Sequence, residues 1–148
     1  MRILAGLLVL LTACSSGGGE EESVFSDLEV VTLISGPARF RVWIADSNAS
    51  RARGLMDATA DDLEPLADGT ARGMLFVFPV SQSVSFWMKD TEVPLDLAYL
   101  DESGRILEVH ALLPLDLTPV PSAVPIRYAL EVRAGELGIG VGDVVDLP

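Results

Sequence analysis

Gly73-Met-Leu-Phe-Val-Phe-Pro79 is the stretch of this sequence that decides the fold. Its five central residues are apolar without alternation, and so short a run before a proline predicts a strand with both faces buried rather than a helix. A strand of this kind needs neighbours on both sides. We therefore expect it to be central in a sheet and to end at Pro79.

A second strand is predicted just downstream, where apolar and polar residues alternate up to Lys89. Side chains of a strand point alternately to opposite faces. Trp87 and Lys89 are therefore expected on one face, with Phe86 and Met88 on the other. Asp90 follows at the predicted strand end, so the pattern places a polar rim beside an apolar core.

The flanking sequence predicts further strands in antiparallel hairpins. Residues 28–34 and 39–44 are expected to pair, and so are 95–100 and 105–113, with Gly104 in a left-handed turn conformation. Two later strands are expected at 127–133 and 144–147. A short helix is expected to end at Gly54, after a cap at one of residues 46–48.

The resulting class is mainly β, with about seven to nine strands and one or two short helical turns. This pattern fits a compact β-sandwich or a closed barrel. Residues 114–125 hold four of the nine prolines and cannot form a central strand, so we expect a long loop across one end of the fold. Whether this loop covers Trp87 or leaves it exposed is open from the sequence.

The N-terminus predicts export. Residues 1–13 combine Arg2 with an apolar run that is too short to span a bilayer, which is typical of a signal peptide. Leu11-Thr-Ala-Cys14 resembles the lipobox of bacterial lipoproteins, which implies a lipid on Cys14; the alternative is an ordinary cleaved signal that leaves a free thiol. Residues 14–26 are expected to form a flexible tether, and residues 27–148 a single β-domain.

Charge and cysteine content exclude several classes of function. The formal net charge is −12, and removing residues 1–13 would leave 9 basic and 22 acidic residues, a net of −13. Such a surface argues against nucleic acid or anionic lipid as a direct partner. Because Cys14 is the only cysteine, an intrachain disulfide and a cysteine-based zinc site are excluded.

Seven strings in order carry a resemblance to a known family. They are Arg53-Gly-Leu-Met56, Gly73-Met-Leu-Phe-Val-Phe-Pro79, Phe86-Trp-Met-Lys89, Pro94-Leu-Asp96, Leu130-Glu131, Ala134-Gly135 and Val141-Gly-Asp143. Over about residues 28–147 the chain resembles the domain of unknown function 192 family. The resemblance implies a small β-sandwich and no agreed activity. The chain departs from the family at Asp90, where members usually have Asn.

No motif identifies a reaction. The only histidine, His110, has no Gly-x-Ser-x-Gly serine to activate, and phosphate-binding and dinucleotide fingerprints are absent from the sequence. Met56, Met74 and Met88 could bind monovalent copper, but core packing explains them more simply. We predict neither a metal nor a cofactor.

The predicted functional rim consists of Arg53, Trp87, Lys89, Asp90, Asp96 and Glu131. An outward tryptophan beside charged groups suits a small polar ligand or a partner protein. The three carboxylates could instead work as acid and base in a glycan-type hydrolase, or Lys89 could form a structural ion pair with them.

The preferred hypothesis is a lipid-anchored binding or accessory module of the cell envelope. Its expected partners are the membrane, through the lipid on Cys14, and a small polar ligand or an envelope protein. The resemblance to bacterial lipoproteins implies that, in a bacterium with two membranes, Ser15 after the cysteine favours the outer membrane, with the domain facing the periplasm. The sequence does not determine the oligomeric state.

Overall fold

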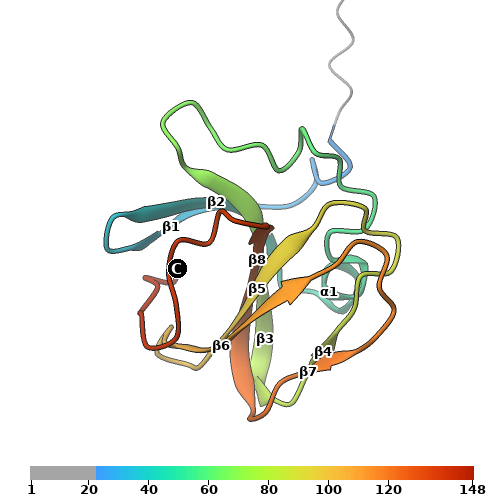
Figure 1. Ribbon diagram of the computed structural model, residues 1–148. Helices are drawn as coiled ribbons and strands as arrows, with labels where there is room; N and C mark the ends of the chain where they lie inside the picture. The colour runs from blue at the N-terminus through green and yellow to red at the C-terminus, as the bar shows by residue number, and fades with distance from the viewer. Residues whose placement is uncertain (1–22) are drawn as a thin grey trace, which may run out of the picture.

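The computed structural model describes residues 23–148, so Cys14 and the predicted signal peptide lie outside the described part (Figure 1). Eight strands and one short helix in these residues confirm the mainly β class. In chain order they are β1 (Val30–Ser35), β2 (Ala38–Ala45), α1 (Asn48–Arg53), β3 (Ala71–Gln82), β4 (Ser85–Phe86), β5 (Leu95–Leu100), β6 (Ile106–Leu112), β7 (Val120–Pro121) and β8 (Ile126–Arg133).

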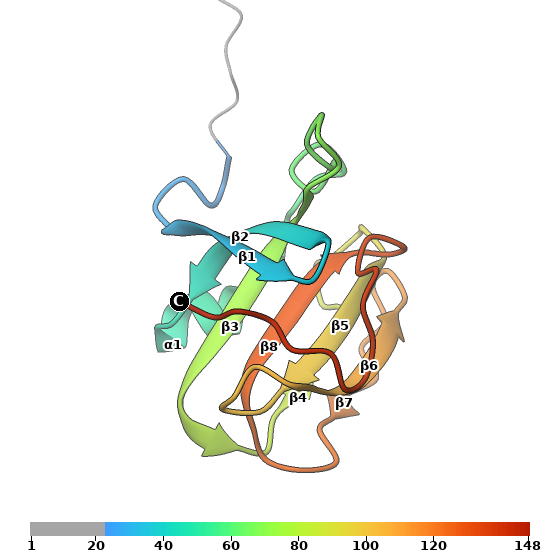
Figure 2. The same cartoon turned by 90° about the vertical axis from the view of Figure 1, so that its left-hand side faces the viewer.

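Six strands form one curled sheet in the order β1-β2-β3-β8-β5-β6, which Figure 2 shows side by side. Only β2 and β3 run parallel, and the chain between them contains α1. β4 and β7 form a separate two-stranded sheet. The sheet does not close into a barrel, so the sandwich-like alternative of the predicted class is the correct one.

β3 is central, as predicted. It pairs with β2 on one side and with β8 on the other, and residues 73–76 are buried. The predicted end at Pro79 is wrong, because the strand continues to Gln82. The register with β8 breaks between Val77 and Gln82, so Pro79 lies where no ladder hydrogen bond is required of it.

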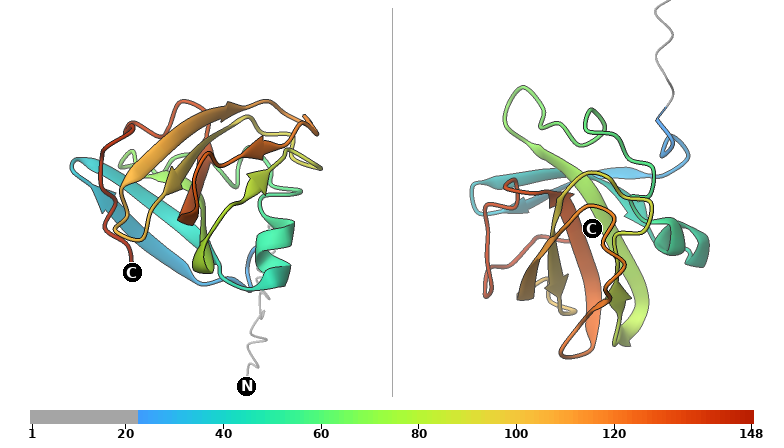
Figure 3. Two further views of the ribbon diagram at one scale, coloured as in Figure 1. Left: turned by 90° about the horizontal axis from the view of Figure 1, so that it is seen from below. Right: turned by 45° about the vertical axis from the view of Figure 1, so that its right-hand side comes forward.

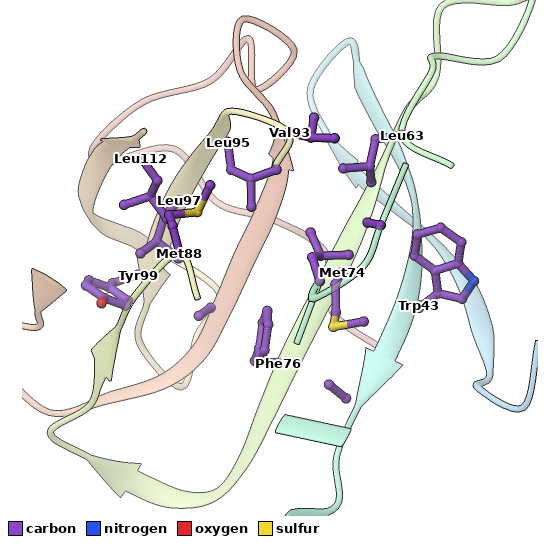
Figure 4. Close-up of a cluster of buried hydrophobic side chains, with 14 of the residues drawn as sticks. Trp43, Leu63, Met74, Phe76, Met88, Val93, Leu95, Leu97, Tyr99 and Leu112 are labelled. Atoms are coloured by element: carbon purple, nitrogen blue, oxygen red, sulfur yellow. The ribbon is translucent and has the colours of Figure 1, made fainter. Parts of the chain in front are cut away.

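Each face of the sheet packs against its own apolar cluster. The first cluster includes the side chains labelled in Figure 4, such as Met74, Phe76, Leu97 and Tyr99, and α1 leads into it through Leu55. Figure 3 shows α1 lying outside the sheet on one side. The second cluster is closed by the C-terminal tail, which crosses the opposite face in Figure 2.

The predicted hairpins and helix are confirmed. β1 pairs with β2, and β5 pairs with β6 through a turn in which Gly104 has φ 79°. The side chain of Ser47 accepts a hydrogen bond from the Ser50 amide and caps α1, and Gly54 ends the helix at φ 53°.

Two predicted strands are shorter or absent. In the segment up to Lys89 only β4 forms, paired with β7 inside the proline-rich loop, because the following turn breaks the pairing. The predicted final strand at 144–147 is wrong: Val144 and Asp146 make single bridges to Arg105 and Ile34. These bridges come from opposite edges of the sheet, so the tail cannot form a continuous ladder with either.

The packed part of the chain begins earlier than the predicted tether boundary. Phe25 is fully buried and stacks on Trp43, with ring centroids 4.6 Å apart. The Val24 carbonyl accepts a hydrogen bond from Arg53 at 2.8 Å. Residues 23–26 therefore pack with the domain.

The helix content bears on membrane spanning. Among residues 23–148, the structure contains no helix with the length and apolar character needed to span a bilayer.

We expect Phe25→Ala to lower the free energy of unfolding by about 3 to 5 kcal/mol, because it leaves a cavity under Trp43. Val24→Ala is the matched control. Since Val24 is 42% exposed, its truncation should change stability by less than about 0.5 kcal/mol. Urea unfolding of both variants checks this, and equal stability of the two would show that residues 23–26 contribute nothing to the core.

Candidate functional site

A pocket of about 290 Å³ lies between α1, β3 and residues 84–91. Four of the six predicted rim residues line it: Arg53, Trp87, Lys89 and Glu131. They come from the helix, from the segment after β4 and from β8, which are distant in the sequence. The fold therefore brings together most of the predicted rim.

The walls of the pocket are largely apolar. Phe76 of β3 and Phe86 of β4 meet edge to face with ring centroids 4.8 Å apart. Met56, Met88 and Leu95 extend the same lining. The alternation predicted for this segment holds, since Met88 is 2% exposed and the neighbouring Trp87 is 48% exposed.

Trp87 and Lys89 share a face at the mouth of the pocket. The Lys89 Nζ lies 5.8 Å from the centroid of the Trp87 ring, a cation–π arrangement. The proline-rich loop binds this segment through its backbone, with the Met88 amide donating to the Asp116 carbonyl at 2.8 Å. It leaves the Trp87 ring half exposed, which answers the question that the sequence left open.

α1 supplies two cations, and sequence reasoning identified only one of them. Arg53 donates to the Val24 carbonyl and lies over the Phe25 ring. Arg51, which was missed, also lines the pocket and donates to the carbonyls of Asp46 and Val77. The composition of the helix could have revealed it, because both basic residues lie in its last turn and its first turn has no acidic residue.

Glu131 is the buried polar group of the pocket. On the sheet it lies between Met74 of β3 and Leu97 of β5, and it is 4% exposed. Burial on the sheet raises the pKa of its carboxyl to about 8, and within residues 23–148 no hydrogen bond to the carboxyl offsets the effect. The carboxyl is therefore largely protonated at neutral pH.

The other two carboxylates lie elsewhere. Asp96 pairs with Val132 on the sheet and so lies on the face opposite Glu131, where it accepts a hydrogen bond from the Gly135 amide at 2.9 Å. Asp90 lines a separate pocket of about 530 Å³. The three carboxylates are therefore not assembled in one pocket. Asp96 lies opposite Val132, one residue from Glu131, and an offset of one residue reverses the face of the sheet, while Asp90 lies in a turn outside the sheet.

The backbone gives a reason for the residue type at Asp90. Its φ is 51°, a left-handed conformation that Asn and Asp adopt more readily than other residues with side chains. The Asp90 carbonyl also accepts a hydrogen bond from the Asp57 amide at 2.8 Å. Asn in the resembling family and Asp here suit the same turn.

The other candidates from the sequence are three methionines and His110. Met74 and Met88 are buried in the first cluster, as core packing predicts, while Met56 lines the pocket. His110 lies 3.1 Å from Glu108 and packs edge to face on Tyr99. Within residues 23–148, no group of three or more His, Cys, Asp or Glu side chains is placed to hold a metal ion.

The buried carboxyl predicts a pH-dependent stability. The pKa of Glu131 is about 8 in the folded chain and near its ordinary value of 4.5 when unfolded. Between these values the unfolded chain loses the proton first. The free energy of unfolding should therefore fall as pH rises from about 5 to about 8, by up to about 1.4 kcal/mol per pH unit.

Glu131→Gln should remove this slope, and urea unfolding across the same pH range measures it. Glu29→Gln is the matched control, because Glu29 is exposed and its loss should leave the slope unchanged. A wild-type slope equal to that of Glu131→Gln would contradict the neutral carboxyl.

Comparisons with known proteins agree with this fold. A protein of unknown function from Novosphingobium aromaticivorans DSM 12444 has a crystal structure with 32% identity and a TM-score of 0.70, covering 82% of this chain and 88% of that chain. A Sinorhizobium meliloti 1021 protein, described as "a putative transcription regulator", has 31% identity and a TM-score of 0.67, covering 80% and 92%. Among curated proteins, no sequence matches the chain.

The family match covers nearly all of the described chain. The sequence profile of domain of unknown function 192, described as uncharacterized ACR, matches residues 30–147. This range agrees with the resemblance carried by the seven strings, and both solved relatives exceed 30% identity over most of the chain. The chain therefore belongs to the domain of unknown function 192 family.

Proposed function

We propose that this protein is a lipid-anchored module of the cell envelope that binds a small molecule in the pocket between α1, β3 and residues 84–91. The observation that carries the binding role is the convergence of Arg53, Trp87, Lys89 and Glu131 on one pocket. A half-exposed tryptophan over an apolar hollow leaves a surface that a ligand would cover.

The family strings support the same location. Five of the seven contribute residues to this pocket, including all four residues of Arg53-Gly-Leu-Met56 and of Phe86-Trp-Met-Lys89. The other two strings, Ala134-Gly135 and Val141-Gly-Asp143, do not line it. The features that identify the family are thus concentrated around the pocket.

The acidic composition argues against two other roles. A net charge of −12 disfavours binding to nucleic acid, so the regulatory description of the Sinorhizobium protein does not extend to this chain. A glycan-type hydrolase would need two carboxylates flanking one bond. Only Glu131 among the predicted carboxylates lines the pocket, so binding is the better-supported role.

The first prediction of the proposed function concerns lipid anchoring at Cys14. Cys14→Ala should move the protein from the membrane fraction to the soluble fraction and block lipid labelling, because the apolar run before it is too short to serve as an anchor. Ser16→Ala is the matched control and should remain membrane-bound. Normal processing and membrane retention of Cys14→Ala would show that the lipid is elsewhere or absent.

The second prediction of the proposed function concerns ligand binding. Trp87 becomes the only tryptophan in a Trp43→Phe background, so energy transfer from Trp87 reports binding of the neutral apolar probe N-phenyl-1-naphthylamine. We expect saturable binding that Ala52→Phe abolishes, because Ala52 is exposed and lines the pocket, where a larger side chain would fill the space.

Ala123→Phe is the matched control, since Ala123 is also exposed and lies outside the pocket lining. It should leave the affinity for the probe unchanged. Equal loss in both variants, or no saturable binding in the parent protein, would contradict the proposed binding role.

A further inference from the structure

The pocket is a local concentration of positive charge in an acidic protein. Arg51, Arg53 and Lys89 line it, and the only acidic residue in its lining is Glu131. None of the three cations forms an ion pair with another residue of the described part of the chain. Arg51 and Arg53 donate hydrogen bonds to backbone carbonyls, and Lys89 lies over the Trp87 ring. These contacts do not neutralise charge, so the lining lacks counter-charge.

Glu131 does not supply that counter-charge. Its carboxyl is buried on the sheet between Met74 and Leu97, and within residues 23–148 it has no hydrogen-bond donor or ion-pair partner. Arg51 and Arg53 of α1 and Lys89 after β4 line the same pocket. Tyr99 of β5 lies nearby, with His110 and Glu108 of β6 beside it. Burial raises the pKa of this carboxyl to about 8. Because three cations stand against this one acidic residue, the lining carries a net positive charge at neutral pH.

The shape of the pocket limits the size of what can enter. Its volume of about 290 Å³ is at the lower end of ligand pockets. Phe76, Phe86 and Met88 offer apolar contact inside, whereas Trp87 and Lys89 lie at the exposed mouth. A small molecule with an apolar body and a charged group directed outward fits this distribution.

From this arrangement we infer that the pocket selects a small organic anion, whose apolar body packs on Phe76 and Phe86 and whose acidic group pairs with Lys89 and Arg53. Neutral Glu131 at the buried end permits the anion to enter, because an ionised carboxylate there would repel it. This inference rests on the proposed function and adds the chemical class of the ligand.

The test compares two probes that share the same rings. 8-Anilinonaphthalene-1-sulfonate carries a sulfonate, and N-phenyl-1-naphthylamine does not. We expect the sulfonate probe to bind more tightly at pH 7. Lys89→Gln should weaken it about tenfold, or about 1.4 kcal/mol, and leave the neutral probe within about twofold, because a single charge-assisted contact is of that size.

Arg41→Gln is the matched control, since it removes the same charge from an exposed position outside the pocket. It should leave both affinities unchanged. An equal effect of Arg41→Gln and Lys89→Gln on the sulfonate probe would mean that only overall charge matters, which would overturn the inference.

The second part of the test varies pH. Raising pH from about 6.5 to about 9 ionises Glu131, so affinity for the sulfonate probe should fall in the wild type and stay level in Glu131→Gln. The neutral probe should show no such fall in either protein. A parallel pH profile of the sulfonate probe in both proteins would overturn the role given to Glu131.

The preference for an anion and the binding role itself can be refuted separately. Saturable binding of the neutral probe without preference for the sulfonate would refute the anion and keep the binding role. Absence of saturable binding of either probe, or binding that Ala52→Phe does not affect, would refute the binding role itself.

Discussion

The close approach of β3 and β8 at Gly73 is the constraint on which the rest of the structure depends. A side-chain Cβ at Gly73 would lie 1.9 Å from the Glu131 carbonyl oxygen, so only glycine allows the two central strands to pair in this register. That register places Met74 and Phe76 on one face of the sheet together with Glu131. The same contact that builds the centre of the sheet therefore also positions the floor of the pocket.

The electrostatics of the pocket follow from that position. β8 is largely buried on both faces, and Glu131, at 4% exposure, loses most of its hydration there without an ion-pair partner in the described chain. The chain tolerates this by keeping Glu131 protonated. The helix and the segment after β4 then add Arg51, Arg53 and Lys89 around a neutral group, so an acidic protein presents a positive hollow. A buried carboxyl without an ion-pair partner lowers the stability of the fold. A role in a binding site therefore explains Glu131 better than a role in folding does.

The sequence correctly predicted the elements that depend on residues close together along the chain. Unbroken apolar character identified β3, Gly104 identified the turn of the β5–β6 hairpin, and a cap among residues 46–48 with Gly54 set the limits of α1. The structure then showed that Ser47 is the cap. The incorrect predictions concern segments whose structure depends on pairing with distant strands. Pro79 did not end β3 because the ladder with β8 is already interrupted there, and residues 144–147 did not form a strand because their partners lie on opposite edges of the sheet. The register of a distant strand is not encoded in either segment.

The sequence by itself determined the class of the fold, the alternation that exposes Trp87 and buries Met88, and the membership of the family, because each depends on short-range periodicity or on ordered strings. Only the tertiary structure decided which candidates meet. It grouped Arg53, Trp87 and Lys89 with Glu131 and placed Asp96 on the opposite face of the sheet. The physical reason is that strand pairing sets the face and depth of each side chain, and depth fixes the protonation of Glu131.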